Sequence, residues 1–233
     1  ALIVTAVSVC LIVPLAFTLP SDPRVRNENV VHTDSFGAIR EAFAHRGFML
    51  LTAGFFVCGF HVAFITVHLP IYVADLELAP MVGALAISLI GIFNIFGSLL
   101  SGAFGQRFSK KLGLSGIYAL RALVLTIFLL SPKTTEVIYL FAASMGILWL
   151  STVPLTAGLV AQVFGIRYMA TLYGFVFLSH QIGSFIGVWM GGYIYDLTGS
   201  YDLMWQAGIL LGLVAAVIHL PIDEAPVARL RRA

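Results

Sequence analysis

The chain has 233 residues, of which 60% are hydrophobic and only 10% are charged, and its formal net charge is +2. A water-soluble domain carries about 25% charged residues, so this composition excludes a soluble globular protein, and the small net charge gives no indication of nucleic-acid binding. The hydrophobic residues gather in seven runs of about 20 residues, the length of a membrane-crossing helix rather than of a barrel strand. The sequence therefore predicts an all-α polytopic membrane protein with seven transmembrane helices.

In chain order, the predicted spans are separated by short polar loops and by one long polar stretch after the first span. Within that stretch, Asp34 or Ser35 can begin a short amphipathic helix that lies along the membrane surface, with Phe36, Ile39 and Phe43 on its apolar face. A mobile linker is the alternative for this stretch. The seven predicted spans cover residues 2–19, 47–72, 81–104, 112–130, 137–160, 168–195 and 203–220.

Basic residues lie on one side of the predicted membrane. The loops at 20–46, 105–111 and 161–167, together with the C-terminal tail, hold nearly all of the thirteen lysines and arginines. The opposite loops carry Lys133 as their single basic residue and are otherwise acidic. The positive-inside rule therefore predicts a multi-pass protein of the cell membrane whose basic face and C-terminus are cytoplasmic.

One basic residue, Arg121, lies about ten residues from either end of its span and therefore near the bilayer centre. An arginine at that depth costs about 3 kcal/mol or more and usually faces the protein interior or a water-filled cavity. It either attracts an anionic substrate or holds the bundle together through hydrogen bonds to Asn94 or to carbonyls of adjoining helices. Because no Asp or Glu lies in the centre of any span, an anionic ligand is slightly favoured as its partner.

Other titratable groups within the spans are few. His61 and His180 can exchange protons near neutral pH, which suits a proton-coupled carrier, although each also suits a packing role with a hydrogen bond. Cys10 and Cys58 lie inside apolar runs, where we expect small buried residues and neither a disulfide nor a metal site. The sequence therefore predicts no cofactor and no catalytic or metal-binding residues.

The fifth span contains Pro154, which frees a backbone carbonyl and bends the helix. Bent or broken helices are where carriers build solute sites near the membrane midplane. Trp149, Thr152 and Thr156 share one helix face beside this proline and are candidates to line such a site. A kink that serves only helix packing is the alternative.

The loop after the third span reads GAFGQRFSKK, which resembles the signature loop of the major facilitator superfamily. Gly102, Arg107, Lys110 and Lys111 match that signature, whereas Gln106 stands where the signature has an acid. The resemblance implies a conformational loop that helps to lock one state of a carrier through charge pairs, here without its acid. The segments HLPIYVADLELAP and GGYIYDLTGSYD look like the second half of bacterial members of the monocarboxylate-porter branch.

This resemblance implies that the seven spans correspond to helices 6–12 of a twelve-helix fold. Residues 1–19 are then the last helix of an N-terminal half, and residues 20–46 are a central cytoplasmic loop with the amphipathic helix. Residues 47–222 form a C-terminal six-helix half, and residues 223–233 form a cytoplasmic tail. Because the chain starts without Met inside an apolar run, we expect the rest of the N-terminal half to be missing from it.

Together, the residues and the resemblance predict a fragment of a secondary transporter, not an enzyme. It moves a small organic anion such as a monocarboxylate by alternating access, with protons as a candidate co-substrate. Its expected partners are the solute, the lipid bilayer and the missing N-terminal half, and no nucleic acid. An efflux carrier for amphipathic molecules and a non-transport receptor or structural module are the alternatives. The candidate substrate-binding residues are His61, Asn94, Arg121, Trp149, Thr152, Thr156 and His180.

Overall fold

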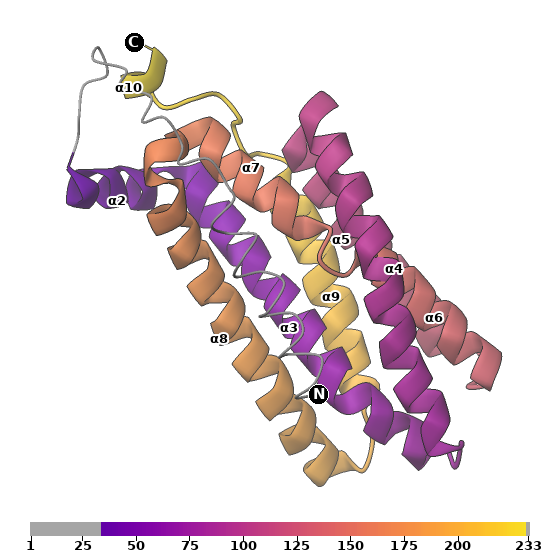
Figure 1. Ribbon diagram of the computed structural model, residues 1–233. Coiled ribbons are helices and arrows are strands. Elements are labelled where there is room, and N and C mark those ends of the chain that lie inside the picture. Colours follow the sequence, from indigo (N-terminus) through magenta and orange to yellow (C-terminus); the bar gives the residue numbers. More distant parts are fainter. Residues whose placement is uncertain (1–33, 232–233) are drawn as a thin grey trace, which may run out of the picture. The chain divides into compact units, whose positions relative to one another are not determined.

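The computed structural model describes residues 34–231, and within that range the chain forms helices and connecting turns without strands (Figure 1). The all-α prediction is thereby confirmed. The first predicted span and residues 20–33 of the long polar stretch lie outside the described residues. The helices are α2 (Ser35–Ala44), α3 (Arg46–Asp75), α4 (Pro80–Arg107), α5 (Lys110–Leu130), α6 (Thr135–Leu148), α7 (Thr152–Phe164), α8 (Ile166–Thr198), α9 (Asp202–His219) and α10 (Ala228–Arg231).

Six helical segments of membrane length correspond to the six predicted spans that fall in the described range. Five of them are the single helices α3, α4, α5, α8 and α9, and the sixth is α6 together with α7. Both α3 and α8 extend a few residues beyond their predicted apolar runs. Residues near the membrane surface keep their helical hydrogen bonds whether or not their side chains are apolar, so hydropathy alone underestimates helix length.

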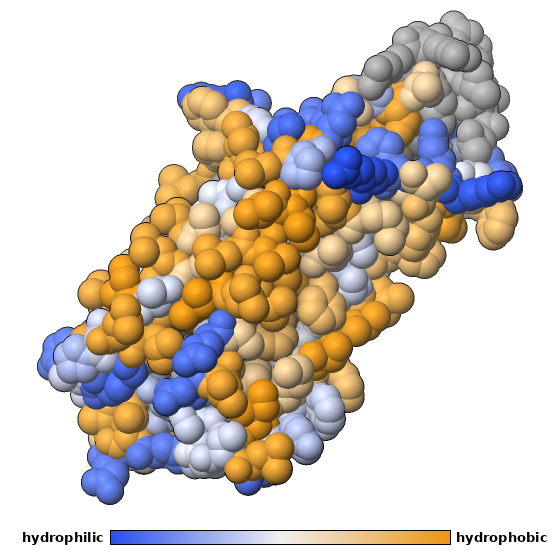
Figure 2. Space-filling view, turned by 180° about the vertical axis from the view of Figure 1, so that it is seen from behind, coloured by the Kyte–Doolittle hydropathy of each residue, from blue (hydrophilic) through white to orange (hydrophobic). Residues whose placement is uncertain are grey.

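The outer surface of the helices is largely apolar. Figure 2 shows one face of the molecule on which hydrophobic residues fill most of the broad middle, while hydrophilic residues gather toward the two ends. Large apolar side chains are exposed on several helices, among them Leu99 of α4, Leu123 of α5 and Leu210 of α9. A soluble monomer rarely exposes apolar patches of this extent, so lipid is the solvent for this surface and the chain is a multi-pass membrane protein.

The spanning helices pack mainly in three pairs, α3 with α8, α4 with α6, and α5 with α9. Helix α3 also contacts α4, α7 and α9, which makes it the central helix of the described bundle. Its contact with α8 is close because Gly59 and Gly183 leave room: a methyl group at either position would collide with backbone atoms of the other helix. Such small residues allow close helix packing where no hydrophobic effect drives it.

Helix α2 runs across the end of the bundle, against α3 and α8 (Figure 1). Asp34 is its N-cap, with Oδ1 accepting a hydrogen bond from the Gly37 amide at 2.9 Å. The buried residues are Ala38 and Ala42, whereas Phe36 is 73% exposed. The alanine face of α2 therefore packs on the bundle, and Phe36 stays uncovered by the described residues.

Candidate functional site

The fifth predicted span is a broken helix. Helix α6 ends at Leu148, α7 begins at Thr152, and residues 149–151 do not continue the α-helix between them. Pro154 explains the break, because it has no N–H for the carbonyl of Leu150 and its ring would clash with that carbonyl in a continuous helix. Within α7 the proline falls in the first turn, where its missing N–H costs little. The bend predicted from Pro154 is therefore a three-residue break in the α-helix just ahead of the proline.

Arg121 of α5 closes the carbonyl end of α6. Its Nε and Nη2 atoms donate hydrogen bonds to the Leu148 carbonyl at 3.2 and 2.7 Å, and Nη2 also donates to the Trp149 carbonyl. The arginine is 0% exposed. Carbonyls at a helix C-terminus carry partial negative charge, and inside a membrane they need donors from the protein itself. Arg121 thus supplies both the hydrogen bonds and the compensating charge, and its partners are carbonyls rather than Asn94.

Asn94 of α4 accepts a hydrogen bond from a backbone amide at the same break. Its Oδ1 accepts a hydrogen bond from the Leu150 amide at 3.0 Å, and the Ser151 hydroxyl donates to the Ile147 carbonyl at 2.5 Å. Gly97, almost one turn further along α4, lets the two segments approach, because a methyl group there would collide with the Ile147 carbonyl. Side chains of α4 and α5 therefore hold the two ends of the interrupted span.

Helix α3 places a thiol against the same guanidinium. Cys58 Sγ lies 3.7 Å from Arg121 Nη2 and 3.2 Å from Thr152 Oγ1. His180 of α8 lies next to this thiol, because its backbone packs against Gly59, the residue after Cys58. The Tyr118 ring lies beside the guanidinium, with its centroid 5.3 Å from the Arg121 Cζ atom, at a distance typical of a cation–π contact. Four helices, α3, α5, α7 and α8, thus contribute polar side chains to one buried cluster.

The structure gathers most of the predicted site residues at this break but not all of them. His61 is directed elsewhere, with Nε2 lying 2.8 Å from the Gly208 carbonyl of α9. Thr156 lies one turn further along α7, and its hydroxyl is buried with no hydrogen-bond partner among the described atoms. All of the seven candidates except Asn94, which is half-buried, are buried in the described part of the chain. The candidates that lie at the break or its rim are Asn94, Arg121, Trp149, Thr152 and His180.

Sequence reasoning missed Cys58 and Tyr118 as neighbours of the buried arginine. Cys58 and Arg121 are 63 positions apart, and no sequence pattern pairs one with the other. The one available signal was that Cys58 shares a face of its helix with His61. A shared face shows which residues point together, but it does not show which other helix they meet.

The predicted conformational loop forms a second polar group, at the end of the bundle that carries α2. Lys110 Nζ donates to Gln162 Oε1 of α7 at 2.7 Å. The backbone amide of Lys111 donates to Glu224 Oε1 at 2.8 Å, which ties the loop to the segment after α9. The other residues of the predicted conformational loop are half-buried or exposed: Gly102, Arg107 and Gln106, which stands in place of the acid.

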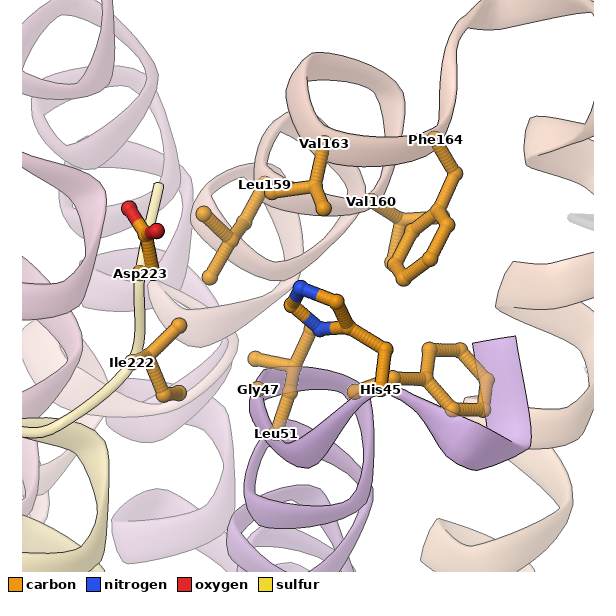
Figure 3. Close-up of a pocket in the computed structure, with 10 residues that line it drawn as sticks. His45, Gly47, Leu51, Leu159, Val160, Val163, Phe164, Ile222 and Asp223 are labelled. Atoms are coloured by element: carbon orange, nitrogen blue, oxygen red, sulfur yellow. The ribbon is translucent and has the colours of Figure 1, made fainter. Parts of the chain in front are cut away.

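A small pocket at the α2 end lies between the start of α3, the end of α7 and the segment after α9 (Figure 3). The imidazole of His45 lies in it, among apolar side chains that include Leu159 and Val160. Its volume of about 10 Å³ suffices for about one water molecule, so it is too small for a solute. A larger groove of about 440 Å³ lies beside the helix break, between α4 and α5, and is lined mainly by apolar side chains and glycines.

Lys133, between α5 and α6, is another cation that binds backbone carbonyls, here those at the end of α5. Its Nζ donates to the carbonyls of Phe128, Leu129 and Ser131 at 2.9, 3.0 and 2.6 Å. Burial lowers the pKa of this ammonium group. Within residues 34–231, no group of three or more His, Cys, Asp or Glu side chains is placed to hold a metal ion.

Comparison with known proteins gives one family. Residues 1–188 match the sequence profile of the Major Facilitator Superfamily. The uncharacterized MFS-type transporter YcxA of Bacillus subtilis is 29% identical over 176 residues, which cover 73% of this chain and 43% of that protein. Mouse monocarboxylate transporter 14 is 28% identical over 209 residues, which cover 83% of this chain and 39% of that protein. The chain thus spans less than half the length of these relatives.

Proposed function

The chain belongs to the Major Facilitator Superfamily, a family of transporters rather than enzymes, and we propose that it is part of a secondary transporter for a small organic anion. The proposed substrate class is monocarboxylates, moved by alternating access together with protons. A relative named as a monocarboxylate transporter supports this class. The buried positive site at the helix break supports it independently.

The helix break is the observation that carries the proposal. Helix α7 begins at Thr152 within the membrane, so its first amides add partial positive charge there. Arg121 adds a full positive charge beside the break. In carriers of this kind of architecture, N-termini of interrupted helices point at anionic groups of the substrate. The acidic residues of the described spans all lie near helix ends, away from this charge: Asp75, Glu136, Asp196 and Asp202.

The seven candidate residues take different roles in this proposal. Those at the break are the proposed solute contacts, with Arg121 acting both as a brace for α6 and as the source of positive charge. His180 is the proposed proton-exchanging group, because it adjoins the cluster and the exposed Gln181. The remaining two join the site when the helices move apart during transport: His61 and Thr156.

The proposed topology follows the charge distribution. Residues 1–19 end an N-terminal half, residues 20–46 link it to the six-helix half at 47–222, and residues 223–233 form a tail. The basic loops put the α2 end and the C-terminus in the cytoplasm of a cell whose plasma membrane holds the protein. Lys110 and Lys111 then form a cytoplasmic latch through Gln162 and Glu224. The remainder of the N-terminal half lies in the rest of the parent protein.

The test uses the full-length transporter that contains this chain, purified into proteoliposomes with a pH-sensitive dye inside. Lactate, pyruvate, acetate, formate and oxalate are added in turn under an imposed pH gradient, and protein-free vesicles correct for passive leak of the acids. We expect protein-dependent proton movement with at least one of these anions. Silence across the panel, with protein that circular dichroism shows to be folded, would contradict proton-coupled anion transport.

A second candidate function, export of an amphipathic molecule, is favoured by one observation. The groove of about 440 Å³ beside the break is mainly apolar, and its lining residues include Gly97, Gly113 and Gly116. Arg121 would then serve only as a brace. The same vesicles loaded with neutral and cationic amphipathic dyes distinguish the two: protein-dependent movement of a dye, without movement of any of the anions, would replace the first proposal by this one.

A further inference from the structure

The buried charge of Arg121 has no acidic side chain beside it among the described residues. The guanidinium contacts backbone carbonyls, the ring of Tyr118 and the sulfur of Cys58. Of these partners, only the phenol and the thiol carry a proton that they can release. The Tyr118 hydroxyl donates its proton to the Gly54 carbonyl at 2.7 Å, a bond that only the protonated phenol can make. Cys58 is therefore the one group in contact with Arg121 that is free to become an anion.

Polar groups converge on the Cys58 sulfur. Arg121 Nη2 donates to it at 3.7 Å, and the Thr152 hydroxyl lies at 3.2 Å, where it donates once the thiol has lost its proton. His180 lies on the other side of the thiol, because its backbone packs against Gly59, the residue after Cys58. Cys58 is 0% exposed, so water does not compete for these donors. An adjoining arginine stabilises a thiolate relative to a thiol. In addition, Arg121 Nη1 is buried without a hydrogen-bond partner in the described structure, so the carbonyls do not saturate the guanidinium.

We propose that Cys58 and Arg121 form a proton-switched ion pair in the membrane interior, with Cys58 as the proton-binding group. In the releasing step, the S–H bond of Cys58 breaks and the proton forms an N–H bond on the neutral imidazole of His180. The products are a thiolate beside Arg121 and an imidazolium. The imidazolium then releases the proton past the exposed side chain of Gln181, whose Oε1 lies 3.2 Å from His180 Nδ1. Uptake is the same sequence in reverse.

This switch would couple protons to anions, a role that rests on the function proposed above. With Cys58 as a thiolate, the pair carries no net charge. Protonation of Cys58 leaves the charge of Arg121 uncompensated in a medium of low dielectric, where a carboxylate is then strongly attracted. Proton uptake therefore precedes anion binding, and the two move in the same direction. The pair thus supplies a coupling site in spans whose centres contain no carboxylate.

Other titratable side chains surround the pair, and their contacts separate them from the switch. His61 Nε2 lies against the Gly208 carbonyl and His219 Nδ1 against the Ala215 carbonyl, so each imidazole has a backbone partner, while His61 Nδ1 is buried without a partner among the described atoms. Helix α7 faces Cys58 with the Thr152 hydroxyl, which does not ionise in the physiological range. The titratable groups around Cys58 and Arg121 are Tyr118 of α5, Tyr173 and His180 of α8, His61 of α3 and His219 of α9.

Infrared spectroscopy of the full-length transporter in lipid tests the switch, because the S–H stretch absorbs where other protein groups do not. The difference between wild type and Cys58→Ser isolates the band of Cys58. We expect this band to disappear as the pH rises between about pH 5 and pH 9. Thr152→Val removes one donor with little change of shape, so the band should persist to a pH higher by about one unit. Thr126→Val is the control, since that hydroxyl bonds the Ala122 carbonyl of its own helix and should leave the titration unchanged.

An S–H band of constant intensity across this pH range would show a neutral packing thiol and overturn the proposal. The absence of the band at every pH would show a permanent thiolate and would equally overturn a role in proton exchange. The measurement needs no solute. If the thiol titrates but the protein moves no monocarboxylate, the proposed function is refuted and the proposed ion pair stands. If the protein moves a monocarboxylate but the S–H band does not change with pH, the proposed ion pair is refuted and the proposed function stands.

Discussion

Two cations of this chain close helix C-termini in the same way but in different surroundings. Arg121 binds the carbonyls of Leu148 and Trp149 at the end of α6, and Lys133 binds three carbonyls at the end of α5. In both cases a positive side chain meets the negative end of a helix dipole. The difference is solvent: Arg121 is 0% exposed at mid-span, whereas Lys133 is half-exposed in a loop.

This difference shows that the stability gained from such a contact depends on what replaces the cation when it is removed. The number of hydrogen bonds that the cation makes matters less. If Lys133 is removed, water reaches the α5 carbonyls and replaces most of what was lost. If Arg121 is removed, no water is at hand, and the α6 carbonyls stay unpaired in a membrane interior. The same substitution should therefore have unequal effects at the two sites. Four substitutions test this, from the largest expected effect to the smallest.

Arg121→Gln should have the largest effect. A glutamine is too short to reach both carbonyls, and each buried acceptor left without a donor costs about 1–3 kcal/mol, so we expect the free energy of unfolding to fall by about 2–6 kcal/mol. Chemical unfolding of the purified transporter in mixed micelles measures the change. Arg107→Gln, an identical substitution at the exposed last residue of α4, is the control. Equal stability of the two variants would remove the distinction between buried and exposed cations.

Gly97→Ala should come next, because its methyl group meets the Ile147 carbonyl and forces the broken helix away from α4. Overpacking of this kind costs about 1–3 kcal/mol. Gly91→Ala on the same helix is the matched control, since a methyl group there has no atom within 4 Å. Both variants are compared by thermal unfolding. A loss of stability in the control that equals the loss at Gly97 would point to helix α4 in general and not to the break.

Asn94→Ala should have a moderate effect, because it leaves the Leu150 amide without its acceptor. Since Asn94 is half-buried, we expect a cost of about 1–2 kcal/mol, toward the low end for an unpaired buried donor. Amide hydrogen exchange measured by mass spectrometry gives a local readout: the peptide that contains residues 149–151 should exchange faster. Unchanged exchange in that peptide would mean that Asn94 does not hold the break.

Lys133→Gln should have the smallest effect, below about 1 kcal/mol, as is usual for a charge at a helix terminus that water can reach. Its contribution should also decline with added salt, whereas that of Arg121 should not. Unfolding measured at low and high ionic strength checks both statements. A loss of stability that is independent of salt and as large as that of Arg121→Gln would mean that water is excluded from this loop as it is from the membrane interior.

Hydropathy predicted the described helices well, because lipid imposes helical hydrogen bonding on every long apolar run. It merged α6 and α7 into one span, because both segments are apolar and only Pro154 hinted at the interruption. Arg121 was identified from sequence because a charge in a span is rare. Its partners were not, because backbone carbonyls of Leu148 and Trp149 leave no trace in the amino-acid pattern. The position of residues 2–19 stays a prediction.

The sequence by itself determined the solvent of this protein, the helical class, the approximate span limits and the presence of one buried charge. All of these follow from local composition and from the cost of unpaired polar groups in lipid. The tertiary structure decided which groups contact that charge. It brought Cys58, Arg121 and Thr152 together from α3, α5 and α7, and it turned His61 toward α9. These choices depend on how close the helices approach, and glycines such as Gly59 and Gly97 set that distance only once the helices are paired.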